Sequence, residues 1–187
     1  MPQVNIHSLA QATFSPRSAF HLALATNIGA GIWVSFIGGV IMYKNLPRPV
    51  FGNIQRKLFP AYFTLGSALS AVLFSLQLKL SPTSQSQLFR PSLSSAFLIP
   101  LLLSSMTISS LTNLLYIGPK TTKIMLNRHA LEEEEKKQYN DSNVGDEMKA
   151  LNKQFGIAHG ISSSLNVFGY LVPSVFVCLW VGEHGFS

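Results

Sequence analysis

Ser18 to Tyr43 reads SAFHLALATNIGAGIWVSFIGGVIMY, a stretch of 26 residues that contains no Lys, Arg, Asp or Glu. Three further stretches share this property: residues 58–78, 91–119 and 154–182. The hydrocarbon core of a bilayer is about 30 Å thick, and an α-helix crosses it with roughly 20 apolar residues. All four stretches are long enough, so the sequence predicts an all-α membrane protein, a bundle of four transmembrane helices.

The predicted spans form a single membrane domain over residues 1–187. We place them at about residues 18–43, 58–80, 94–118 and 156–181. A cleaved signal peptide is the alternative for the first stretch, but its apolar region has only about 7–15 residues and ends at small side chains. This stretch is longer and ends at Tyr43 and Lys44, so we expect it to be a span.

The basic residues divide unevenly between the two sides of the membrane. The loops after the first and third spans share one side, and 11 of the 14 Lys and Arg residues lie in these loops. The other side has Arg17, Lys79 and Arg90. Because basic loops are retained in the cytosol, we expect loops 44–57 and 120–153 to be cytosolic and both termini to be lumenal or extracellular. The Asn140-Asp141-Ser142 acceptor then stays unglycosylated.

The net charge of +6 is explained by these loops. Basic residues next to a bilayer are attracted to anionic lipid headgroups, each by about 1 kcal/mol. We therefore expect the partners to be the lipid bilayer and its anionic headgroups, and we expect no nucleic acid.

The stretch NLPRPVFGNIQRKLFPAYF, residues 45–63, joins the first two spans. Pro47 and Pro49 are expected to stop the first helix. Between Pro49 and Pro60, apolar residues recur at helical spacing, which predicts a short amphipathic helix lying in the plane of the membrane interface. It would serve as an elbow between the spans or as a recognition surface for a partner or a lipid headgroup. With the segment after the third span, the candidate surface comprises Arg48, Phe51, Gln55, Arg56, Lys57, Lys120, Thr121, Thr122 and Arg128.

The loop at 120–153 is expected to be a solvated, helical part of the cytosolic side. Glu132 with Lys136, and Glu133 with Lys137, are pairs at helical i,i+4 spacing in the favourable order.

Polar residues inside the spans are the candidates for function, because each needs a hydrogen-bonding partner in lipid. A polar path between the third and fourth spans would be lined by His159, Asn166, Asn113, Ser162 and Ser163. The alternative is that hydroxyl and amide groups simply hold the helices together. Gly31, Ser35 and Gly39 recur at spacing four, which favours close helix contact and is a candidate contact for a homodimer.

Several classes of function lack support in the sequence. No carboxylate lies within a predicted span, and the chain has no CxxC, HExxH or phosphate-binding loop. His21 and His159 are expected near opposite edges of the membrane, so they cannot hold a haem between them. We expect no enzyme activity, no cofactor and no metal site.

Three motifs resemble the transmembrane protein 205-like family. They are GIWVSFIGGVIMYKNLPRPVFGNIQRKLFPAYF (31–63), GPKTTKIM (118–125) and FGIAHGISSSLN (155–166). The resemblance implies a four-span protein of the endomembrane system or plasma membrane, from a family linked to drug export and secretion without an agreed mechanism. Some members have Glu where this chain has Gly118, which argues against proton coupling here.

Two functions fit these observations. The first is a small transporter, or an accessory to export or secretion, with its path between the third and fourth spans. The second is a structural or assembly subunit that binds a membrane partner or lipid through its basic cytosolic face. A continuous hydrated cavity would favour the first, and a fully packed bundle with an occupied outer groove would favour the second.

Overall fold

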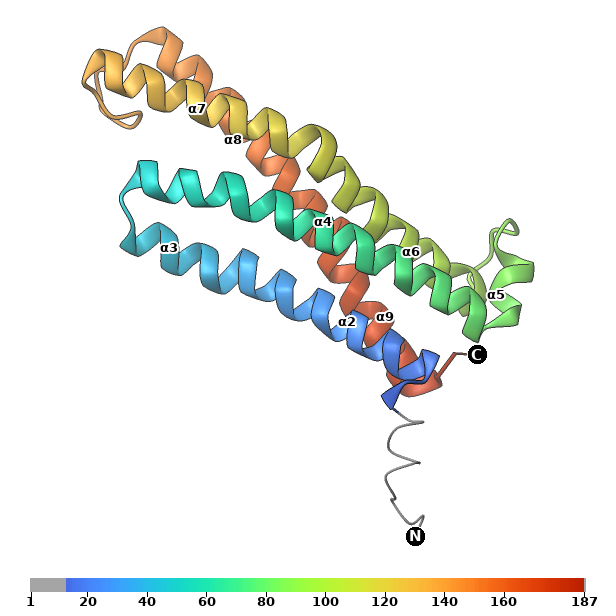
Figure 1. The fold of residues 1–187 in the computed structure, drawn as a ribbon. Coiled ribbons are helices and arrows are strands. Elements are labelled where there is room, and N and C mark those ends of the chain that lie inside the picture. The colour runs from blue at the N-terminus through green and yellow to red at the C-terminus, as the bar shows by residue number, and fades with distance from the viewer. Residues whose placement is uncertain (1–12, 187) are drawn as a thin grey trace.

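A computed structural model describes residues 13–186 of the chain, and within this range it is a bundle of helices (Figure 1). Four helical segments are long and apolar enough to cross a membrane: Pro16–Asn45, Arg48–Leu80, Ser95–Glu135 and Asp146–His184. They are called spans 1 to 4 below. The predicted all-α, four-span fold is confirmed.

Span 1 consists of α2 (Pro16–Ile32), the π-helical turn η1 (Trp33–Gly38) and α3 (Gly39–Asn45). Ser15 is its N-cap, and the Ser15 hydroxyl accepts a hydrogen bond from the Ser18 N–H at 3.1 Å. Leu46 is extended because the residue before a proline disfavours the helical conformation. The chain therefore turns at Leu46 and Pro47 into span 2.

Span 2 is one continuous helix, α4 (Arg48–Leu80), with Pro60 inside it. The segment expected to lie in the membrane plane instead forms the first turns of this helix. One side of these turns packs on protein: the Phe51 ring lies 5.7 Å from the Tyr43 ring, and Gly52 packs against Met125 and His129 of α7. Val50 and Ile54 stay exposed. These contacts with α3 and α7 hold the segment in line with span 2, which explains the difference.

Span 3 follows the short helix α5 (Pro82–Gln87) and consists of α6 (Ser95–Thr112), η2 (Asn113–Ile117) and α7 (Gly118–Glu135). Span 4 consists of α8 (Asp146–Asn166), η3 (Val167–Leu171) and α9 (Val172–His184). Spans 3 and 4 have 41 and 39 residues, against 30 and 33 for spans 1 and 2. At 1.5 Å per residue, each has a length of roughly 60 Å, well beyond a hydrocarbon core of about 30 Å.

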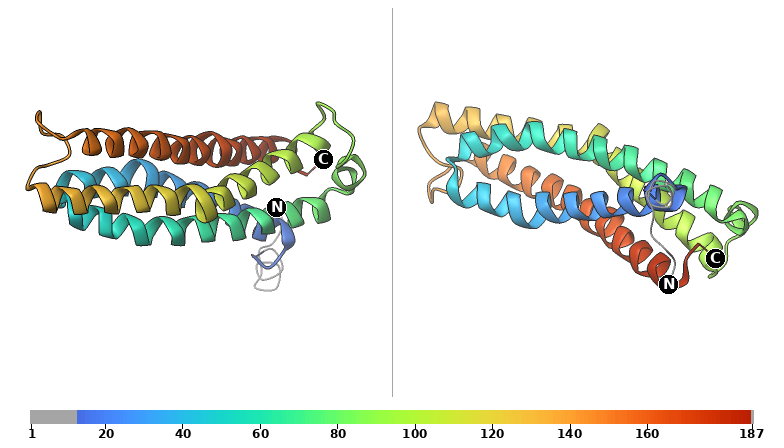
Figure 2. Two further views of the ribbon diagram at one scale, coloured as in Figure 1. Left: turned by 90° about the horizontal axis from the view of Figure 1, so that it is seen from above. Right: turned by 60° about the horizontal axis from the view of Figure 1, so that its bottom comes forward.

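The extra length of spans 3 and 4 forms a helical hairpin at one end of the bundle (Figure 1). This α7–α8 hairpin comprises residues 118–155, and residues 136–145 connect its two helices. The loop at 120–153 was expected to be helical, and the structure shows helix on both sides of this connection. In both views of Figure 2 the α7–α8 hairpin lies at one end of the bundle, and the start of α2 and the end of α9 lie at the opposite end. We call these the hairpin end and the terminal end.

The bundle has large apolar side chains inside and also on its outer surface. Phe20, Leu73, Leu103, Met106 and Val177 are fully buried in the core shared by the four spans. Outward-facing side chains are apolar as well: Ile108, Tyr116, Phe168 and Leu179 are each more than half exposed. An apolar outer surface suits a lipid environment, so polar contacts inside the bundle must specify how the helices fit together.

Candidate functional site

Asn166 of span 4 hydrogen-bonds two other spans inside the bundle. Its Oδ1 accepts from the Tyr62 hydroxyl of span 2 at 2.8 Å. Its Nδ2 donates to Ser35 Oγ of span 1 at 2.7 Å. One amide therefore links three helices, and this uses both of its polar atoms.

A second set of contacts connects the same three spans. The Tyr170 hydroxyl of span 4 donates to Asn27 Oδ1 of span 1 at 2.6 Å, and Asn27 Nδ2 lies 3.5 Å from Ser70 Oγ of span 2. The rings of Tyr62 and Tyr170 meet edge to face, with centroids 6.0 Å apart. The two Asn–Tyr pairs thus form one continuous polar cluster, in which no member carries a formal charge.

Span 3 joins this cluster through the main chain of its neighbours. The Ser110 hydroxyl donates to the Phe63 carbonyl at 2.9 Å, and Asn113 Nδ2 donates to the Ser162 carbonyl at 3.1 Å. The Ser105 hydroxyl lies 3.4 Å from the Gly169 carbonyl, which Pro173 leaves without its usual helical donor. We call the whole set the interior polar network: Asn27, Ser35, Tyr62, Ser70, Ser105, Ser110, Asn113, Asn166 and Tyr170.

Three π-helical turns contain members of this network. Ser35 lies in η1, Asn113 begins η2, and Tyr170 lies in η3. A π-helical turn adds a residue to the helical repeat and is frequent at functional sites. Glycine is needed where η2 ends, because a Cβ at Gly118 would lie 2.5 Å from the Asn113 carbonyl oxygen. Gly118 therefore has a local structural role in this chain.

Of the residues expected to line a polar path, Asn113 and Ser162 come together, and His159 and Ser163 lie apart from them on the surface. His159 is exposed on the outer face of α8 and stacks on Phe155, with ring centroids 5.6 Å apart. Ser163 is exposed too, and Ser162 meets Asn113 through its main-chain carbonyl. Asn113 is fully buried, and its Oδ1 has no hydrogen-bond partner within the described range. Asn113 and Asn166 thus join helices, whereas His159 belongs to the surface.

The candidate surface at the hairpin end divides into an inner and an outer group. Arg48 forms an ion pair with Glu132 at 2.9 Å, and its guanidinium carbon lies 3.3 Å from the centre of the Tyr139 ring. The Arg128 guanidinium lies 4.4 Å from the same ring and 4.6 Å from the Phe155 ring. These contacts, which we call the arginine clamp, fix the hairpin connection to α4, α7 and α8.

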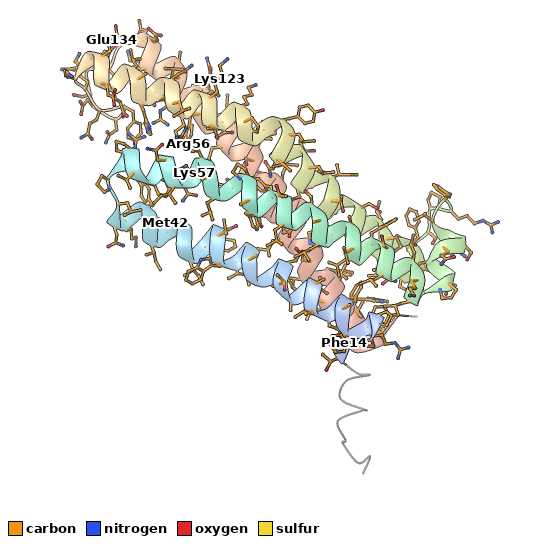
Figure 3. All side chains as sticks on the ribbon, in the orientation of Figure 1. Phe14, Met42, Arg56, Lys57, Lys123 and Glu134 are labelled. Carbon is orange, nitrogen blue, oxygen red and sulfur yellow. The ribbon has the colours of Figure 1, made fainter. Side chains whose placement is uncertain are left out.

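Other residues of the candidate surface also turn inward. Gln55 is buried, Phe51 packs on Tyr43, and the Thr121 hydroxyl donates to the carbonyl of Ile117 at 2.7 Å. Thr122 is half-buried. The outer group consists of Arg56, Lys57 and Lys120, which are exposed. Figure 3 shows Arg56 and Lys57 on α4 and Lys123 on α7, at the hairpin end.

Burial governs the titration of two groups near the clamp. It lowers the pKa of His129 below its ordinary value of 6.5, because the half-buried imidazolium loses hydration. Burial also lowers the pKa of Arg128, and the nearby positive charge of Arg48 lowers this pKa further. Aromatic faces provide compensation, since a guanidinium over such a ring gains about 0.5–2 kcal/mol. Among residues 13–186, no three His, Cys, Asp or Glu side chains are grouped to hold a metal ion.

Sequence reasoning missed the two tyrosines of the network and the tyrosine of the clamp, Tyr139. Tyr62 lies in the stretch 45–63 that joins the first two predicted spans, yet it is buried inside the bundle. No sequence pattern indicated a role for Tyr170 or Tyr139. A tyrosine inside an otherwise apolar span is a usable signal, because its hydroxyl must find an acceptor there.

Comparison with known proteins gives the family of this chain. A family model described as "Domain of unknown function (DUF4149)" matches residues 22–130, more than half of the chain. The chain belongs to the DUF4149 family. The matched range includes Asn27, Tyr62 and the arginines of the clamp, and it ends before α8. The DUF4149 assignment agrees with the resemblance noted from the motifs, and it brings no reaction with it.

One relative carries a descriptive name. Transmembrane protein 205 of Danio rerio is 34% identical to this chain over 58 residues, which are 29% of this chain and 31% of that protein. The aligned part is therefore less than a third of that relative. No solved structure matches the chain significantly.

Proposed function

We propose that this DUF4149 protein is a structural or assembly subunit that presents the α7–α8 hairpin to a membrane-protein partner on the cytosolic side. The spans would anchor the hairpin in an endomembrane or the plasma membrane. Both termini would then lie on the lumenal or extracellular side. We assign it no enzymatic reaction.

The arginine clamp is the observation that carries this proposal. Arg48, at the start of span 2, holds Glu132 and Tyr139, while Arg128 lies against Tyr139 and Phe155. The Tyr139 N–H also donates to Glu132 at 2.8 Å, and the Asn152 side chain donates to the Tyr139 carbonyl at 2.8 Å. These contacts order a connection that would otherwise be a flexible loop. An ordered surface binds a partner at lower entropic cost.

The interior polar network supports the same proposal. Asn166 and Asn113, which a solute path would need, hydrogen-bond neighbouring spans instead. The outer face of the hairpin and the adjoining start of α4 remain accessible. Their exposed charged residues carry both signs: Arg56, Lys57, Lys120, Lys123, Glu133, Glu134, Lys136, Lys137, Asp141, Asp146, Glu147, Lys149 and Lys153. Those nearest the membrane suit anionic headgroups, which would orient the hairpin above the bilayer.

Site-specific photo-crosslinking in cells tests the proposal. A photoreactive residue at position 123 should crosslink to one identifiable membrane protein. For the charge reversal, the photoreactive residue is placed at position 127. Lys123→Glu in this chain should reduce the crosslinked product about tenfold, compared with the same chain that keeps Lys123. Lys79→Glu, an exposed residue at the terminal end, is the matched control and should leave it unchanged. No discrete crosslinked protein, or equal losses with both variants, would contradict the proposal.

A transporter, or an accessory to export or secretion, is the second candidate. The three π-helical turns beside the network favour it, since such turns occur often at functional sites. Solute flux into protein-containing liposomes that is lost with Asn166→Ala, and that Lys123→Glu leaves intact, would support transport. The assembly role predicts no flux above that of protein-free liposomes.

A further inference from the structure

A pocket opens at the terminal end of the bundle. It has a volume of about 530 Å³ and lies between the first turns of α2, the last residue of α4 and the end of α9. Gly185 has a positive φ of 69°, which glycine adopts readily and which turns the chain back after α9. Phe186 then packs edge to face on Phe20, with ring centroids 5.0 Å apart, and forms one wall of the pocket.

Basic side chains line this pocket from two helices. Arg17 and His21 lie about one turn apart on α2, and His184 is the last residue of α9. No Asp or Glu is among the described residues that line the pocket. Within residues 13–186, neither Arg17 nor His21 forms a hydrogen bond or an ion pair. The pocket therefore offers N–H donors and positive charge to an anion, which favours an acidic ligand.

Trp180 fixes the ring of His184 at the edge of the pocket. The two rings are stacked, with centroids 4.2 Å apart and planes 14° apart. His184 Nδ1 also lies 3.3 Å from the Trp180 carbonyl oxygen. An imidazolium donates from Nδ1, so His184 in its charged form keeps this contact and adds a second positive charge to the wall.

The other walls and the position of the pocket indicate the rest of the ligand. Leu80, Val181 and Phe186 form apolar walls beside the basic residues. Arg17 directly precedes the charge-free stretch 18–43, which places the pocket at the edge of the hydrocarbon core, where the headgroups of lipids lie. A ligand at this level has an acidic group next to an acyl chain. A free phosphate ion shares the acidic group but cannot use the apolar walls.

We infer that this pocket binds the phosphate of an anionic phospholipid from the leaflet at the terminal end. Arg17 and His21 donate hydrogen bonds to the phosphate oxygens, and the charge of His184 attracts the same group. Leu80 and Val181 contact the first part of the acyl chain. A bound lipid thereby ties the start of span 1 to the end of span 4. The site is at the opposite end from the α7–α8 hairpin, so it is independent of what the hairpin binds.

Trp180 provides a readout from this site alone. The chain has two tryptophans, and Trp33→Phe leaves Trp180, which stacks on a residue of the pocket, as the single reporter. A local readout is needed because Arg56 and Lys57 at the hairpin end also attract anionic lipids. The Trp33→Phe chain is placed in phosphatidylcholine nanodiscs with a small share of phosphatidic acid brominated near its headgroup. This lipid should quench Trp180 fluorescence at about a tenfold lower share than equally brominated phosphatidylcholine.

Substitutions in the pocket decide whether the quenching reports binding there. Arg17→Gln/His21→Gln should remove the preference for phosphatidic acid, and both positions are exposed, so the helical circular dichroism spectrum should not change. Lys79→Gln is the matched control, because Lys79 is an exposed basic residue at the same end that does not line the pocket. Equal quenching by the two lipids, or a preference that survives Arg17→Gln/His21→Gln, would overturn the inference.

Inorganic phosphate distinguishes a lipid site from a site for the free ion. Added phosphate should leave the quenching as it is in sodium chloride of equal ionic strength, because the free ion gains nothing from the apolar walls. Recovery of Trp180 fluorescence in phosphate alone would show that the pocket takes the free ion and would overturn the assignment to a lipid.

Discussion

The hydroxyl of Tyr170 donates a hydrogen bond of 2.6 Å to Asn27 Oδ1, which joins the last span of the chain to the first. The Tyr62–Asn166 pair, at 2.8 Å, joins span 2 to span 4 beside it. All four side chains are buried and uncharged. In a membrane, apolar side chains meet lipid as readily as they meet each other, so such pairs select which helix faces pack together.

Removing the amide of Asn166 should weaken the bundle. Asn166→Ala loses two interhelical hydrogen bonds and leaves the buried Tyr62 hydroxyl without its acceptor. Interhelical hydrogen bonds in membranes contribute roughly 0.6 kcal/mol each and up to about 2, so we expect the free energy of unfolding to fall by about 1–3 kcal/mol. Denaturation in detergent measures the change. Asn127→Ala, at an exposed position of α7, is the control, and equal stability of the two variants would contradict the account.

Adding a methyl group at Gly52 should loosen the α7–α8 hairpin. A Cβ there would lie 2.8 Å from His129 Cε1 and 3.0 Å from Met125 Sδ. Gly52→Ala therefore forces these two side chains of α7 to shift, and we expect a cost of about 1 kcal/mol, the low end for overpacking. Faster amide hydrogen exchange over residues 118–155 is the expected readout. Gly29→Ala has open space around it and should be neutral or slightly stabilising, because alanine favours a helix. Similar exchange in both variants would show that this contact does not hold the hairpin.

Acid should destabilise the hairpin end through His129. The pKa of His129 is lowered in the folded state, so between pH 6.5 and the lower folded value the unfolded chain binds a proton that the folded chain does not. The free energy of unfolding should accordingly fall as the pH drops through 6.5. His129→Gln should reduce this slope in denaturation curves recorded at several pH values. A slope that is unchanged in the variant would mean that other groups cause the pH dependence.

The proposed orientation makes a prediction at Asn140. A cytosolic hairpin never meets the glycosylation enzymes of the lumen, so Asn140 should carry no glycan when the chain is expressed in a eukaryotic cell. An acceptor tag appended after Ser187 should be glycosylated in the same cells. Sensitivity to glycosidase on a gel distinguishes the two sites. A glycan on Asn140 would place the hairpin on the lumenal side and would invert the topology.

The sequence was sufficient to predict the four spans, because long charge-free stretches report directly on a hydrocarbon solvent. It did not reveal what covers each face. Phe51 and Ile54 have the helical spacing of an interfacial helix, but periodicity alone cannot show that Phe51 packs on Tyr43 of α3 while Ile54 stays exposed. The same limit explains His159, whose residue type suggested a path while its position on α8 turns it outward.

The arginine clamp shows a second limit. Arg48 and Arg128 are 80 positions apart and were expected to face a partner or lipid. They instead flank Tyr139, a pairing that depends on where the hairpin folds back and that no local pattern encodes. Cation–π contacts, unlike hydrophobic periodicity, leave no signal in sequence spacing.

Thiol accessibility tests most directly whether the interior polar network is a closed contact between helices or the lining of a path. Ser70 and Ser110 are buried members of the network, and Ser→Cys changes little in size. In a Cys178→Ala background, a charged, membrane-impermeant methanethiosulfonate should modify Ser142→Cys in the exposed connection from the hairpin side. The account predicts that neither Ser70→Cys nor Ser110→Cys is modified from either side of the membrane. Modification of either one at a rate near that of Ser142→Cys would show that water reaches the network and would contradict the account.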